Sequence, residues 1–91
     1  MPAPQKGYKT INHHDVQYRW IMQNLRGESE LIVFAADAVR GQRLIAKLPK
    51  IVSYDRVTEA IDFAKTNGWM PHQAGNDFHC AYRRGAFHLD G

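Results

Sequence analysis

Five histidines and a single cysteine are the residues of this 91-residue chain best suited to acid–base, metal or nucleophilic chemistry. They are His13, His14, His72, His79, Cys80 and His88. A structural zinc site needs four ligands that converge tetrahedrally, usually from pairs separated by a short spacer. His13 is adjacent to His14, and His79 to Cys80, and neighbours in a strand point to opposite faces. The sequence therefore predicts no metal site and no cofactor.

Cys80 has the pattern of a core residue. It alternates in phase with Phe78 and Tyr82, as a small buried hydrophobic residue does. A nucleophilic cysteine would need a histidine base and an orienting group beside it, for which Asn76 and Asp77 are close in the sequence. The alternation favours burial over catalysis.

One enzymatic mechanism is kept as a hypothesis, the cleavage of a phosphodiester by histidine acid–base chemistry without a metal. In it, His72 or His79 would transfer protons beside Arg83 and Arg84. His79 is the candidate catalytic residue. The chain has no phosphate-binding loop, paired carboxylates or nucleophile elbow, so the predicted function is non-enzymatic.

Residues 67–82, NGWMPHQAGNDFHCAY, bear on the enzymatic hypothesis. This segment resembles the core of HicA-type toxins, small ribonucleases whose fold is like a double-stranded-RNA-binding domain. In that family a helix ends in glycine and an aromatic residue, and a polar loop, a glycine and a histidine-bearing strand follow. The resemblance implies a metal-independent ribonuclease with His79 as its histidine. In this chain Asp77 stands two residues after Gly75, where the family has its histidine, and His79 comes two residues later.

A cluster of basic residues is the leading candidate for a binding surface. It comprises Arg40, Arg43, Lys47 and Lys50, and the chain as a whole has a formal charge of +3. Such a cluster suits phosphate groups or an acidic protein surface. If Arg43 and Lys47 lie on the strand face opposite its leucines, both project from the side that a helix leaves open. A second candidate surface consists of Tyr82, Arg83 and Arg84, in which the tyrosine would stack on a base.

Residues 53–71 predict the helix that positions these groups. Ser53 is placed to cap its first turn, and Gly68 followed by Trp69 predicts a Schellman-type stop, with Trp69 folded back on the helix. Pro71 prevents continuation. The buried stripe is expected to comprise Val57, Ala60, Ile61 and Ala64.

The remaining elements are predicted as strands. Alternating or apolar runs at 16–23, 30–36 and 42–48 predict a three-stranded antiparallel meander. A C-terminal strand or hairpin begins at Phe78. The predicted fold is a two-layer α+β sandwich, in which residues 1–9 form a flexible tail and residues 10–91 a single domain.

A second resemblance covers most of the domain. The elements YRW at 18–20, GQRL at 41–44, NGW at 67–69, Pro71 and Phe78 resemble a family of small uncharacterised bacterial proteins. The resemblance implies a single α+β domain and no particular activity.

Composition narrows the class of protein. With 44% hydrophobic residues the chain is too apolar for a disordered one, and no apolar run is long enough to span a membrane. The lack of an apolar stretch in residues 1–9 and the lone Cys80 predict a cytoplasmic protein of bacterial or phage origin. The predicted function is an interaction module that binds a protein partner or a second copy of itself, with nucleic-acid binding or ribonuclease activity as alternatives.

Overall fold

The computed structural model describes residues 7–25, 28–38, 40–48 and 53–89. These residues form an α+β fold with six strands and one helix. In chain order the elements are β1 (Lys9–His13), β2 (Val16–Leu25), β3 (Glu28–Ala35), β4 (Leu44–Leu48), α1 (Tyr54–Thr66), β5 (Phe78–Arg83) and β6 (Ala86–Leu89). Helix α1 has neither the length nor the apolar run that a membrane span requires, so no membrane-spanning helix is found in the described part of the chain.

The six strands form one mixed sheet in the order β1-β2-β3-β4-β5-β6. The antiparallel pairing of β2, β3 and β4 matches the predicted meander in part, because these strands belong to a larger sheet that also contains β1, β5 and β6. Helix α1 then carries the chain back so that β5 pairs with β4 in parallel, and β6 returns antiparallel to β5 as a hairpin. The crossover explains the parallel pair, because two neighbouring parallel strands require a long connection between them.

Strand β1 was not predicted. It pairs antiparallel with β2 at the edge of the sheet, with Lys9 opposite Trp20 and His13 opposite Val16. Ile11 is its one buried residue, so the segment has too little apolar alternation to reveal a strand. The predicted boundary between tail and domain, after residue 9, lies one residue inside β1, because the strand already begins at Lys9.

The helix has the predicted ends. Ser53 Oγ accepts a hydrogen bond from the backbone N–H of Arg56, 3.3 Å away. At the other end Gly68 has a left-handed backbone with a φ of 105°. The N–H of Trp69 donates to the carbonyl of Ala64 over 2.9 Å, as in a Schellman stop.

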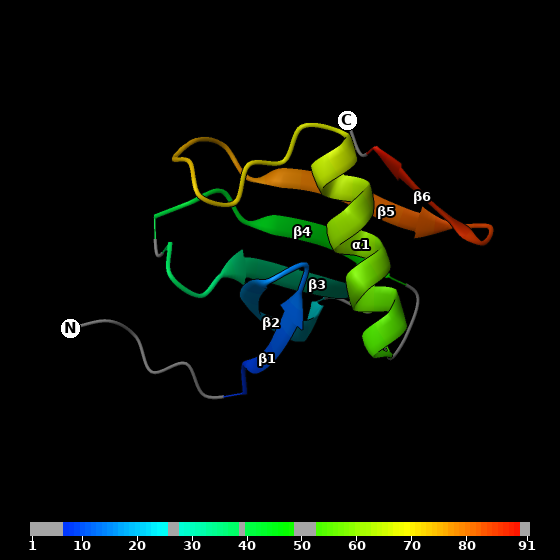
Figure 1. The fold of residues 1–91 in the computed structure, drawn as a ribbon. Helices are drawn as coiled ribbons and strands as arrows, with labels where there is room; N and C mark the ends of the chain where they lie inside the picture. The colour runs from blue at the N-terminus through cyan, green and yellow to red at the C-terminus, as the bar shows by residue number, and fades with distance from the viewer. Residues whose placement is uncertain (1–6, 26–27, 39, 49–52, 90–91) are drawn as a thin grey trace.

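The core lies between α1 and one face of the sheet, which the helix crosses in Figure 1. The predicted helix stripe is fully buried. It packs with inward-facing residues of the central strands, among them Leu31, Val33, Leu44 and Ala46. Trp69 joins the same core, and its ring stacks on that of Tyr18 with 5.9 Å between centroids.

Candidate functional site

The sheet face opposite α1 carries most of the predicted binding residues. Because strand side chains alternate, the residues between the core positions share this face. We call it the open face, and its main residues are Arg19, Ile21, Glu30, Ile32, Phe34, Ile45, Lys47, His79, Ala81, Arg83 and His88. Lys47 is exposed here, opposite the buried Leu44, Ala46 and Leu48, as predicted.

An apolar row crosses the centre of the open face. Ile21, Ile32 and Ile45 stand directly beside one another on β2, β3 and β4. Ile32 is only 7% exposed, although it is not part of the core under the helix. The next position along this row is His79 on β5. The row is a hydrophobic patch on a face that no described helix or strand covers, although Gly7 lies close to Ile21 and the Tyr8 ring packs against the neighbouring Phe34.

Charged residues surround this row. Lys47 lies between Glu30 on β3 and Ala81 on β5, and Arg19 lies opposite Phe34. Arg83 extends the same face toward the β5–β6 hairpin. The described strand positions of the open face therefore include three permanent cations, Arg19, Lys47 and Arg83, and two acidic residues, Glu28 and Glu30, which leaves the face a small positive excess.

Arg43 is engaged differently from the prediction. It lies just before β4, and its Nη2 donates to Asp77 Oδ2 over 2.8 Å, while its backbone N–H donates to Asp77 Oδ1 over 3.3 Å. The Arg43 hydrogen bonds lower the pKa of Asp77, and the same contact raises the pKa of Arg43. Arg43 thus joins the loop before β4 to the loop before β5. Its positive charge is paired with the carboxylate of Asp77 within the molecule.

This ion pair predicts a pH effect on stability. Folding lowers the pKa of the Asp77 carboxyl below its ordinary value of 3.8. The ionised carboxylate therefore stabilises the folded protein fully above pH 3.8, and this contribution is lost as the pH falls through the lowered pKa of the folded state. Asp77→Asn should therefore lower the melting temperature near neutral pH, by the equivalent of up to about 1 kcal/mol for so exposed a pair, and much less in acid. Melting curves of both proteins across this range test the expectation. Curves that stay parallel down to about pH 3 would contradict it.

The second predicted surface is divided between two faces. The Tyr82 ring lies on the helix side, 4.9 Å from the Phe87 ring and 4.0 Å from the Arg56 guanidinium. Arg83 lies on the open face, and Arg84 sits in the hairpin turn with a φ of 53°. The structure therefore places Tyr82 and Arg83 on opposite faces, because consecutive strand residues alternate, and binding by these residues stays a prediction.

Arg83 and Arg84 instead line a shallow hollow with His88 and Leu89. Of the other predicted binding residues, Arg40 is exposed before Gly41, and Lys50 lies outside the described residues.

Cys80 is fully buried in the core, which bears out the structural interpretation of its pattern.

The two histidines of the enzymatic hypothesis have different surroundings. His79 is exposed on the open face, beside Ile45. His72 lies in the loop after α1, where its Nε2 is 2.9 Å from Asp37 Oδ1. His72 and Asp37 also line a hollow together with Arg19. Proton transfer by either histidine stays a prediction.

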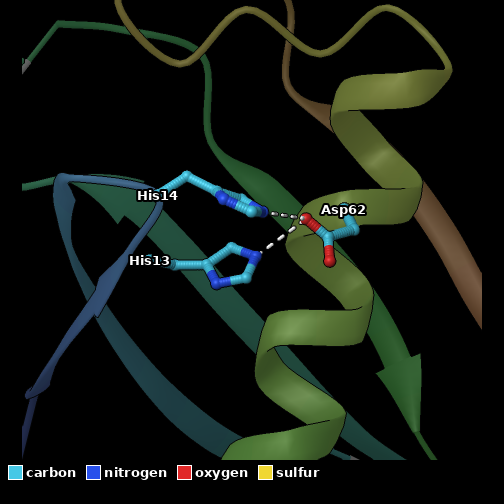
Figure 2. Close-up of side chains that lie close together, drawn as sticks. All are labelled: His13, His14 and Asp62. Carbon is cyan, nitrogen blue, oxygen red and sulfur yellow. Dashed lines mark hydrogen bonds and ion pairs between the residues drawn. The ribbon is translucent and has the colours of Figure 1, made fainter.

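The structure brings together three residues that sequence reasoning missed. His13 and His14, at the β1–β2 turn, meet Asp62 on α1 (Figure 2). His13 Nε2 is 2.7 Å from Asp62 Oδ1, and His14 Nε2 is 3.5 Å from the same oxygen. The two imidazole rings are tilted against each other with 4.1 Å between centroids.

The turn explains why adjacency does not separate these histidines. His14 and Asp15 both have left-handed backbones, with φ of 51° and 64°, as in the type I′ turn of a two-residue hairpin. Strand alternation ends at such a turn, so both rings reach the helix. The expectation that His13 and His14 point apart was wrong. The polar pair His14-Asp15 between Ile11 and Val16 is the signal that could have indicated the hairpin, whereas nothing local marks Asp62.

The chain matches no protein-family model, no curated protein and no solved structure. Two features of the molecule bear on its function, the open face and the cluster of His13, His14 and Asp62.

Proposed function

We propose that this protein is a non-enzymatic interaction module, a two-layer α+β sandwich that binds an acidic protein partner through its open face. The observation that carries the proposal is the apolar row of Ile21, Ile32 and Ile45, bordered by a positive excess. An apolar centre within a charged rim is the usual anatomy of a protein–protein interface.

The apolar row supplies the central contact. Adjacent strands lie about 4.8 Å apart, so three aligned isoleucines extend over roughly 10 Å of surface. Ile21 and Ile45 are still partly exposed, and a partner side chain laid across them would remove that apolar area from water. Aliphatic side chains of this kind pack against other aliphatic or aromatic groups. This packing does not require the geometry of base stacking.

The charges favour an acidic partner over a second copy of the chain. In a twofold-symmetric dimer the same patch meets itself, so two faces that both carry a positive excess would be brought together. Like charges placed together at an interface oppose binding. The domain is therefore expected to be monomeric by itself, and sedimentation at several concentrations checks this.

Nucleic acid is the less favoured partner. A sheet that binds single-stranded RNA presents exposed aromatic rings on which bases stack. Phe34 is the aromatic strand residue of the open face, and the ring of Tyr8 already packs against it edge-on, with 5.4 Å between centroids. Tyr82, the tyrosine considered for stacking, lies on the opposite face.

The double variant Lys47→Glu/Arg83→Glu tests the open face and leaves the Arg43 pair with Asp77 intact. Immobilised wild-type protein is expected to retain a defined protein from a nuclease-treated lysate of the source cells. The double variant should retain at least about ten times less, because rim charges of the wrong sign repel an acidic partner. Its stability should fall by less than about 2 kcal/mol, since the changes are at exposed strand positions.

The matched control is Lys9→Glu/Lys65→Glu, which makes the same change in net charge at exposed positions on the side of the helix. It should retain the partner as the wild type does. Equal loss in both variants would show a general effect of charge and contradict the proposal. Capture that disappears on nuclease treatment would identify nucleic acid as the ligand instead.

A further inference from the structure

We propose that His13, His14 and Asp62 form a zinc-binding site that fastens the β1–β2 hairpin to helix α1. The proposal rests on the convergence of two imidazole nitrogens and one carboxylate oxygen from segments 49 residues apart in the chain (Figure 2). It is independent of the proposed function, because the cluster lies on the helix side of the sheet.

The distances are close to those that a zinc ion imposes. Zinc binds nitrogen and oxygen ligands at about 2.0 to 2.2 Å, so two ligands in a tetrahedral site lie roughly 3.3 to 3.5 Å apart. The separation of His14 Nε2 and Asp62 Oδ1 is 3.5 Å, and that of His13 Nε2 and the same oxygen is 2.7 Å. All three ligand atoms lie within 4.8 Å of one another. Small side-chain rotations that open the shorter contact are enough to admit the ion.

The backbone holds this arrangement in place before any ion binds. The left-handed turn at His14 and Asp15 directs both imidazoles to the same side. His13 is anchored, with 17% of its side chain exposed, and Asp62 is carried by the middle of a capped helix. His14 and Asp62 are 71% and 53% exposed, which gives an ion a path from solvent and room for a water molecule as fourth ligand.

The donor set selects the class of metal. Imidazole nitrogen suits zinc and its transition-metal neighbours, whereas magnesium and calcium prefer sites made of oxygen ligands. Two imidazoles with one carboxylate therefore favour Zn²⁺ over Mg²⁺. Cobalt(II) should occupy the same site and report its coordination through visible absorption.

Zinc binding should stabilise the folded chain, because the unfolded chain does not hold the three ligands together. Zinc at a hundredfold excess over its dissociation constant should raise the melting temperature by about 10 to 20 °C for a domain of this size. Magnesium at the same concentration should leave the melting temperature unchanged.

The test is calorimetric titration of metal-free protein with Zn²⁺, together with melting curves. Wild-type protein is expected to bind one zinc ion per chain. The variant His14→Asn should bind at least about ten times more weakly, since even residues outside the metal's own ligands cost ten- to a hundredfold when removed. Asparagine tolerates the left-handed backbone at this position, so the turn is preserved. A second variant, Asp62→Asn, should also weaken binding while keeping the exposed helix surface.

His72→Ala is the matched control, because His72 also contacts an aspartate, Asp37, but no third ligand among the described residues joins this pair. It should bind zinc as the wild type does. Equal affinity in wild type and His14→Asn would overturn the proposal. So would a ratio of one zinc to two chains, which would show that exposed histidines of separate molecules share the ion.

Discussion

Replacing Trp69 by alanine is expected to destabilise the domain by about 3 to 5 kcal/mol, as large-to-small changes at buried aromatic residues do. Trp69 is 2% exposed and its ring stacks on Tyr18. Its indole Nε1 also donates to the carbonyl of Gln42 over 3.0 Å. The substitution thus leaves a cavity and an unpaired carbonyl together. Domains of this kind have roughly 5 to 15 kcal/mol in total, so the loss is a large fraction.

Urea unfolding of the wild type and of Trp69→Ala measures this loss. Met70→Ala is the control, because Met70 is the next residue and is 48% exposed. It should change the free energy of unfolding by less than about 1 kcal/mol. If Trp69→Ala were as mild as the control, Trp69 would not be the anchor of the loop after α1.

Gly41→Ala is expected to be the second most damaging substitution, with a loss of about 1 to 3 kcal/mol or more. A Cβ added at Gly41 would lie 1.8 Å from the carbonyl oxygen of Pro71 and 2.9 Å from its carbonyl carbon. Both obstacles are backbone atoms, so the two loops would have to separate. Separating the loops would also stretch the neighbouring hydrogen bond from the Gln42 N–H to the Gln73 carbonyl, which is 2.9 Å long.

Amide hydrogen exchange at Gln42 and thermal unfolding together test this expectation. The exchange of Gln42 should accelerate in Gly41→Ala more than that of strand amides remote from the loop, such as Val33. The backbone of Gly41 is outside the left-handed region, and at such a position alanine ordinarily stabilises by about 0.4 to 1 kcal/mol. A stability equal to or above that of the wild type would therefore show that the loops do not meet closely at Gly41.

The helix was predictable because its signals are local. Ser53, Gly68 and the backbone of Trp69 each bond to groups no more than five residues away, and the stripe of Val57, Ala60, Ile61 and Ala64 follows from the helical period alone. The central strands were predictable for a related reason. The segments 16–23 and 42–48 largely alternate between apolar and polar residues, and 30–36 is a continuous apolar run that suits a middle strand.

The candidate sites were predicted less completely, since each depends on a partner distant in the sequence. Lys47 was placed correctly by alternation along its own strand. The engagement of Arg43 depends on Asp77, and the apolar row depends on the register of three strands, which brings Ile21, Ile32 and Ile45 side by side.

The sequence by itself thus determined the helix with its caps, the antiparallel pairing of the central strands and the burial of Cys80 and Trp69. These follow from periodicity and from interactions between near neighbours. The tertiary structure alone decided that β1 joins the edge of the sheet, that β5 runs parallel to β4, and that the β1–β2 turn meets α1 at Asp62. The physical reason is that these contacts join groups far apart in the chain. Their geometry is set by the packing of whole elements, which no local pattern of residue types encodes.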